Sequence, residues 1–215
     1  MLKDIYSRYA GICAVIMKKT SGNSYDFLGS GFFITARGYI ITSSNIVAPS
    51  DELYINIPHS NKSFSNIIDE NITTIPVSLQ QYDEENGLAL LKTAEPTDLS
   101  VPLKLFDSTE DLQCGSSISC IGFPFGRESI YVPSIIKTII SAKYLLKNAK
   151  KILQLDTPYS LGLVGSPAIN IHSGLIAGVM TNPLIDTSGT DLKLSYAIAI
   201  DQTDSVLRSE GLYIK

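Results

Sequence analysis

Short apolar segments, separated by turn-forming residues, recur along the chain from residue 12 onward. They are rich in Ile, Val, Tyr, Phe and Thr and are interrupted by Gly, Pro, Asn and Ser, which is the pattern of an all-β protein. The pattern predicts a first set of strands near residues 11–17, 28–35, 38–42, 52–57, 63–69, 73–80 and 87–92. It predicts a second set near residues 117–122, 129–141, 151–156, 166–171, 174–181 and 193–199.

The two ends of the chain carry helical signals instead. Apolar residues near the N-terminus have the i, i+3, i+4, i+7 spacing of one helical face: Leu2, Ile5, Tyr6 and Tyr9. Gly11 ends this pattern, which predicts a short N-terminal helix. At the other end, residues 201–211 are predicted to form a C-terminal helix with Asp201 as its N-cap.

The stretch between the two sets of strands has the features of a linker. Residues 94–105 include Pro96 and Pro102 and show no periodicity, which favours a connection over a regular element. We therefore expect one domain with two lobes of six strands each, although the pattern marks seven segments in the first set. The expected divisions are the whole domain at 1–215, an N-terminal lobe at about 11–93, a linker at about 94–105, a C-terminal lobe at about 106–200 and the helix at about 201–211.

The composition indicates a folded chain and argues against a nucleic-acid partner. Of the 215 residues, 44% are hydrophobic and 18% are charged, values that do not fit a disordered chain. The 17 basic and 21 acidic residues give a net charge of -4 and form no basic cluster. Because a phosphate backbone is bound through such clusters, we expect no DNA or RNA partner.

Neither a membrane span nor a signal peptide is expected in this chain. No apolar run approaches the ~18 residues that a membrane span needs, and Asp4 and Arg8 interrupt the segment where a signal peptide needs an apolar run. This leaves the periplasm and the cytoplasm both open. The cysteines, Cys13, Cys114 and Cys120, are odd in number, and the last two lie too far apart in an extended segment to form a bridge. We expect free, buried thiols.

Three segments, taken in order, carry a resemblance to a known family. They are GSGFFITARGYIITSSNIV at 29–47, YDEENGLALLK at 82–92 and LQLDTPYSLGLVGSPAIN at 153–170. Together they resemble the HtrA (Deg) family of trypsin-like serine proteases. Supporting matches are IGFPFG at 121–126, HSGLIAGVMT at 172–181 and LSYAIAI at 194–200. The resemblance covers nearly the whole chain and implies two perpendicular six-stranded β-barrels of the trypsin-like (chymotrypsin) fold, with a cleft between them. We expect no PDZ domain after residue 211.

The catalytic positions of the family hold other residues in this chain. By the resemblance, Asn45 stands where the family has its catalytic histidine, Gly87 where it has its aspartate, and Val164 where it has its nucleophilic serine. Val164 has no heteroatom to attack a carbonyl, and Asn45 cannot act as a base near neutral pH. Gly87 has no side chain that could orient a base. The substitutions imply a catalytically inactive pseudoprotease.

Two other parts of the family's site have counterparts here. The family builds its oxyanion hole from backbone N–H groups that correspond to Val164 and Gly162, and backbone donors do not depend on side-chain identity. The alternative is that Gly162 and Gly165 only close a tight turn. The resemblance also implies a peptide groove along a strand edge, whose alternative is a strand covered by the chain's own loops. The groove candidates are Tyr159, Gly178, Val179, Met180, Thr181 and Asn182.

A relocated catalytic centre finds little support in the sequence. The histidines, His59 and His172, both fall in apparent hairpin turns, where solvated histidines are common. Ser166 would point away from the nucleophile side of an extended segment, and the other serines near the motifs lack a base: Ser43, Ser44 and Ser160. We expect no cofactor and no metal. Whether folding brings the two histidines together as metal ligands stays open.

These inferences favour a protein that acts by binding. The leading hypothesis is an inactive HtrA-like pseudoprotease that binds a protein or an extended peptide in the remnant cleft. One alternative is a scaffold or regulatory subunit that uses its outer surface, which a cleft filled by Tyr159, Leu161, Leu163 and Val164 would favour. Another is a divergent serine-type peptidase with unorthodox catalytic residues. The resemblance also implies a trimer, since HtrA relatives often form trimers.

Overall fold

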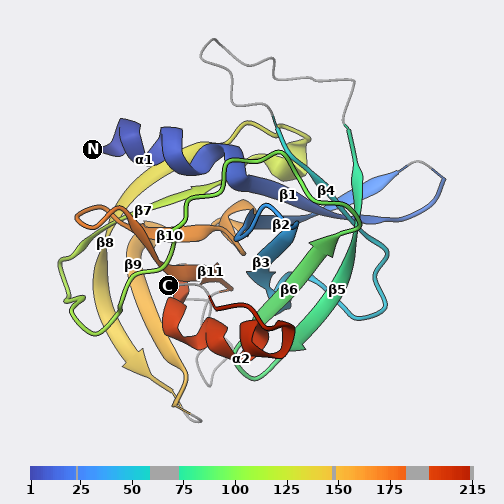
Figure 1. Cartoon of the computed structure of the whole chain (residues 1–215). Helices are drawn as coiled ribbons and strands as arrows, with labels where there is room; N and C mark the ends of the chain where they lie inside the picture. The colour runs from blue at the N-terminus through green and yellow to red at the C-terminus, as the bar shows by residue number, and fades with distance from the viewer. Residues whose placement is uncertain (23, 59–72, 147–148, 183–193, 214–215) are drawn as a thin grey trace, which may run out of the picture.

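Two closed antiparallel barrels make up the described part of the protein (Figure 1). The structure, a computed structural model, describes residues 1–22, 24–58, 73–146, 149–182 and 194–213. The first barrel has the strand order β1-β2-β3-β6-β5-β4. Its strands are β1 (Cys13–Lys19), β2 (Tyr25–Phe33), β3 (Tyr39–Ser43), β4 (Leu53–Asn56), β5 (Ile75–Asp83) and β6 (Leu88–Thr93).

The second barrel repeats this arrangement after a linker. Its strand order is β10-β11-β12-β9-β8-β7. Its strands are β7 (Ser117–Gly122), β8 (Ser134–Leu145), β9 (Lys151–Pro158), β10 (Pro167–Asn170), β11 (Leu175–Thr181) and β12 (Leu194–Ala199). The predicted all-β fold of two six-stranded barrels is therefore confirmed. The predicted strand at 63–69 lies outside the described residues.

The strand boundaries differ from the predicted ones where local turns intervene. Strand β8 begins at Ser134 instead of at 129, because residues 126–128 form a 3-10 turn and Ser129 adopts a left-handed conformation. Strand β5 continues to Asp83, three residues past its predicted end. The half-buried positions of this continuation hold the polar residues Gln81 and Asp83, which hid it from the hydrophobic pattern.

The two terminal helices pack on opposite barrels. Helix α1 (Leu2–Tyr9) lies against β7 of the second barrel (Figure 1), where Tyr9 Oη donates to the carbonyl of Gly174 at 2.7 Å. Helix α2 (Asp204–Leu207) contacts β5 and β6 of the first barrel. Gln81 of β5 donates to Glu210, just beyond α2, at 2.8 Å.

The predicted C-terminal helix is present in divided form. A 3-10 turn, η6 (Ile200–Thr203), precedes α2, and a second one, η7 (Arg208–Glu210), follows it. The prediction of Asp201 as the N-cap is wrong, because Asp201 lies inside η6. Its carboxylate instead accepts from the hydroxyl of Thr109 and pairs with Lys151.

All three cysteines are free thiols, as predicted, but the expectation that they are buried is wrong for Cys114. Cys13 and Cys120 are buried, whereas Cys114 is exposed. Burial raises the pKa of both buried thiols, that of Cys120 to about 12, so they stay protonated and unreactive at neutral pH. Within the described ranges, no helix is long and apolar enough to cross a bilayer.

We expect Tyr9→Phe to destabilise the fold by about 1 kcal/mol, because it removes the hydrogen bond of a fully buried side chain and leaves the Gly174 carbonyl without that donor. Urea denaturation followed by circular dichroism measures this change in the free energy of unfolding. Tyr6→Phe is the matched control, since the Tyr6 hydroxyl makes a longer bond of 3.2 Å to the Pro133 carbonyl from a half-buried position. An equal loss in both variants would contradict the importance of the buried bond.

Candidate functional site

Asn45 lies in a short 3-10 turn directly after β3. This turn, η2 (Ser44–Ile46), is capped by Ser43, whose Oγ accepts from the Asn45 backbone N–H at 3.4 Å. The Asn45 side chain is exposed, while its neighbour Ile46 is buried. The turn therefore presents position 45 outward while an apolar neighbour fixes it to the core.

Gly87 ends the tight turn between β5 and β6. Its N–H donates to the Asp83 carbonyl at 2.8 Å, and its own carbonyl accepts from the Ser44 N–H at 3.0 Å and from Ser43 Oγ at 3.2 Å. Its φ of 79° is a left-handed value that glycine adopts at little cost. These bonds hold the turn directly against η2.

Val164 follows a third short turn, η5 (Leu161–Leu163), and is only 1% exposed. Its carbonyl accepts from the Ser30 N–H of β2 at 2.8 Å, so the turn of the second barrel is bonded to a strand of the first. The next residue, Gly165, donates its N–H to the Met180 carbonyl at 2.8 Å. Val164 thus sits where the two barrels meet.

A side-chain bond connects the first of these positions to the second barrel. Asn45 Nδ2 donates to Thr181 Oγ1, at the end of β11, at 3.0 Å. Together with the Ser44–Gly87 and Ser30–Val164 bonds, it places the three positions of the family's triad around one junction of the barrels. None of the three side chains can serve as nucleophile, general base or carboxylate orienter.

The oxyanion-hole counterpart is closed in this structure. The Val164 N–H donates to the Leu161 carbonyl of its own turn at 3.0 Å. The Gly162 carbonyl accepts from the Phe123 N–H at 3.0 Å and from Ser30 Oγ at 2.7 Å. Because an oxyanion hole needs two converging free N–H donors, the Val164 donor does not serve that purpose in this conformation.

The prediction of an open strand edge along Gly178, Val179 and Met180 is wrong. These residues pair with β12 on one side of β11 and with β10 or Ser166 on the other, and their side chains are buried. An interior strand has no free backbone groups for a ligand. Three groove candidates remain beside the junction: Tyr159, Thr181 and Asn182, with Tyr159 Oη donating to Asn182 Oδ1 at 3.5 Å.

Lys150, which the sequence pattern did not reveal, comes from the second barrel and lies against Gly87. A Cβ added at Gly87 would meet Lys150 Nζ at 2.9 Å, and Nζ donates to the Glu85 carbonyl at 3.3 Å. Desolvation lowers the pKa of Lys150, and the charge of Asp83 opposes this effect. No local signal in the sequence reveals a contact between hairpins of two different barrels.

Asp83 organises the turn that carries Gly87. Its carboxylate accepts from the Asn86 N–H at 2.8 Å and from Asn86 Nδ2 at 2.7 Å. Burial by itself would raise the pKa of Asp83. The bonds from Asn86 and Ser205 and the charge of Lys150 outweigh it, so the pKa lies below its ordinary value of 3.8. The turn is therefore held by a charged group.

Asp83→Asn should destabilise the fold by about 1 kcal/mol at neutral pH, a modest value because the carboxylate is partly exposed. A lowered folded-state pKa contributes stability above the unfolded-state pKa, and this contribution is lost as pH falls through the folded-state pKa. The difference between wild type and variant should thus shrink below about pH 4. Urea titrations across pH 2–7 check this, and a difference that stays constant would contradict it.

Three of the serines near the junction are occupied or inaccessible. Ser43 Oγ donates to the Gly87 carbonyl and Ser44 Oγ to the Asp83 carbonyl. Ser166 is fully buried, and its Oγ has no hydrogen-bond partner among the described residues. A nucleophilic serine needs an adjacent base and access to the substrate, and the described geometry supplies neither to these hydroxyls.

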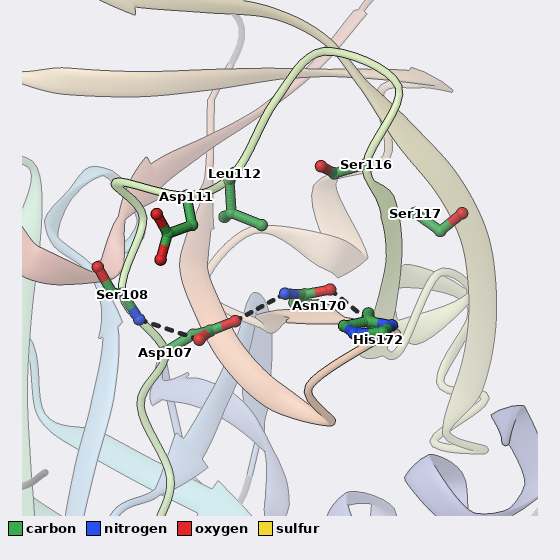
Figure 2. Close-up of a pocket in the computed structure, with 8 residues that line it drawn as sticks. All are labelled: Asp107, Ser108, Asp111, Leu112, Ser116, Ser117, Asn170 and His172. Atoms are coloured by element: carbon green, nitrogen blue, oxygen red, sulfur yellow. Dashed lines mark hydrogen bonds between the residues drawn. The ribbon is translucent and has the colours of Figure 1, made fainter.

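His172 lies in the turn between β10 and β11, at a separate hollow of about 260 Å³ (Figure 2). Hydroxyls and carboxylates gather there, but the Asp107 carboxylate accepts from Asn170 Nδ2 at 2.8 Å and from Ser173 Oγ at 2.7 Å. Figure 2 shows Asn170 between Asp107 and the histidine. An Asp–His pair of the triad type is therefore not formed.

His59 lies outside the described residues, so its pairing with His172 as metal ligands stays a hypothesis. Among the described residues, no group of three or more His, Cys, Asp or Glu side chains could hold a metal ion.

Known proteins resemble this chain in sequence. A profile of the trypsin-like peptidase domain family matches residues 29–179. A probable periplasmic serine endoprotease DegP-like of Pseudomonas fluorescens is 31% identical over 174 residues, covering 81% of this chain and 33% of that protein. The corresponding protein of Pseudomonas putida is 32% identical over 177 residues, with the same coverage. The chain spans about a third of the length of these relatives.

Solved structures share the fold at low sequence identity. The HtrA-type protease AlgW with decapeptide superposes with a TM-score of 0.73 at 20% identity, covering 97% of this chain and 67% of that chain. The serine endoprotease from Yersinia pestis has a TM-score of 0.70 at 18% identity, covering 97% and 66%. The chain belongs to the trypsin-like peptidase domain family. Within that family its likeness is to the HtrA proteases, as predicted from the three sequence segments.

Proposed function

We propose that this protein is a catalytically inactive HtrA-like pseudoprotease that binds an extended peptide at the junction of its barrels. The observation that carries the proposal is the set of three substitutions at one junction: Asn45, Gly87 and Val164. Loss of a triad as a unit costs on the order of 10⁶ in kcat. The carboxamides of Asn45 and Asn182 at the junction are suited to binding, since they are neutral and at least partly exposed.

Binding an extended peptide does not require a catalytic triad. One structure that the fold resembles is described as an HtrA-type protease with decapeptide. In this chain, the described residues that remain at least partly exposed to such a ligand are Asn45, Asn182 and Tyr159, while Thr181 is buried beneath Asn45. Because only a few hydrogen bonds of about 1 kcal/mol each are available, we expect micromolar affinity.

A fluorophosphonate probe, which labels activated serines, should not label the protein, because no serine at the junction has an adjacent base. Labelling is measured by intact mass after prolonged incubation, with trypsin as the positive control. Fluorescein-labelled casein should also stay uncleaved. Stoichiometric labelling that casein competes away would overturn the inactive assignment.

A scaffold role is the second candidate, in which the outer surface contacts a partner. It is favoured by the closed turn at Val164, whose N–H is already bonded, and by the burial of Leu163. An array of overlapping casein decapeptides separates the two functions. Binding of extended segments below millimolar concentration favours the peptide-binding function, and its absence favours the scaffold.

A further inference from the structure

The carboxamide of Asn45 has hydrogen-bonding capacity that the described residues do not use. A carboxamide offers two N–H donors and an oxygen with two lone pairs. One donor is taken by Thr181 Oγ1 at 3.0 Å, and the side chain is exposed. The second N–H and Oδ1 have no partner among the described residues, so this group can still bind one donor and one acceptor.

The carboxamide is also held in one orientation. Ser43 caps the turn that carries Asn45, and Thr181, which receives its bond, is only 5% exposed and pairs with Tyr196 in the barrel wall. A polar group that is fixed before binding loses little side-chain freedom when it meets a ligand.

The strand geometry beside Asn45 points to an extended ligand. The main-chain groups of Met180 face Gly165 and Ser166, with which they bond. Asn182 follows directly after β11, and a main chain that continues the alternation of the strand turns at Asn182 to the same side as at Met180. The described residues offer it no partner there. A peptide that follows this side would pass the Asn45 carboxamide.

A peptide group is the ligand that matches a carboxamide, because each presents one N–H and one C=O. We propose that Asn45 binds the main chain of the ligand peptide, with Oδ1 accepting one peptide N–H and Nδ2 donating to one peptide carbonyl. This inference rests on the proposed function and assigns a binding role to the position that the family uses for its catalytic base. It implies recognition of extended peptides with little dependence on their side chains at this point.

The test combines a change in the protein with a change in the peptide backbone. The probe is the strongest-binding decapeptide of the casein array, synthesised also as a series in which each peptide nitrogen in turn is methylated. Binding is measured by calorimetry to the full chain. Asn45→Ala should weaken the unmodified decapeptide about tenfold, the effect of one or two hydrogen bonds. Thr181→Val should weaken it less, because it only frees the carboxamide to rotate.

At one position of the peptide, the effect of methylation should depend on the presence of the Asn45 side chain. In wild type, methylation there should weaken binding about tenfold, whereas in Asn45→Ala the methylated and unmodified peptides should bind alike. If every methylated peptide loses the same factor in both proteins, the role of Asn45 is overturned while peptide binding stands. If no decapeptide binds wild type, the proposed function itself is overturned. Circular dichroism of each variant verifies the fold.

Discussion

Gly165→Ala is expected to destabilise the protein by about 4 kcal/mol, enough to unfold much of it at 37 °C. Gly165 has a φ of 86°, which strains any residue with a Cβ. An added Cβ would also overlap the Ser30 carbonyl and Thr42 Oγ1 of the first barrel. The close approach of Gly165 to Ser30 and Thr42 of the first barrel thus depends on the absence of a side chain at position 165. Urea denaturation followed by circular dichroism measures the loss.

Gly115→Ala separates the two causes. Gly115 has a similar φ of 90°, but a Cβ there would meet nothing within 4 Å. This control should lose only the strain of about 1–3 kcal/mol. Equal losses in the two variants would mean that the contact with Ser30 and Thr42 contributes nothing, contrary to the expectation.

Restoring the triad is expected to leave the protein inactive. The variant Asn45→His/Gly87→Asp/Val164→Ser should cleave casein no faster than wild type, on the order of 10⁶ below a working triad. A carboxylate at position 87 would lie beside the Lys150 ammonium and pair with it, because a Cβ there comes within 2.9 Å of Nζ. The Val164 N–H, bonded to Leu161, would leave the oxyanion without one of its two donors.

Adding Lys150→Met to this variant removes the expected ion pair between Lys150 and the new carboxylate at position 87. We expect it to release the new carboxylate but not to restore turnover, since the turn at Leu161 stays closed. Fluorophosphonate labelling and casein cleavage are measured on both variants. If the triple variant turns over casein as fast as an active HtrA protease, neither the pairing with Lys150 nor the occupied Val164 N–H prevents catalysis.

The strands of both barrels could be predicted from the sequence because each strand has a local hydrophobic pattern. Strands such as β1 and β6 are short apolar runs between turn signals, and such runs predict core strands without knowledge of their partners. The Asp83–Asn86 turn, which we did not predict, also carries a local signal, since Asp, Asn and Gly stand at turn positions. These features depend on neighbours within a few residues.

Features that depend on distant neighbours could not be predicted. The hydrophobic pattern of a fully buried strand does not show whether it is an edge or an interior strand. The pairing of β11 with strands on both sides could therefore not be predicted. The approach of Lys150 to Gly87 joins hairpins of two barrels. Closure at Val164 depends on the direction of a single N–H, which side-chain identity does not determine. Family likeness gave the positions but not their contacts.

The exchange of terminal helices between the barrels has a consequence for synthesis on the ribosome. The first barrel lacks the cover of α2 until residues 204–207 are made, because α2 contacts β5 and β6 and its Leu207 lies in the core cluster that both barrels share. Helix α1 in turn waits for Gly174, its partner 165 residues later. The nascent first barrel therefore exposes apolar surface while the second barrel is being made, at about 5–20 residues per second. Neither barrel is fully covered by its own segment of the chain, so the emerging chain is exposed to aggregation until α2 docks.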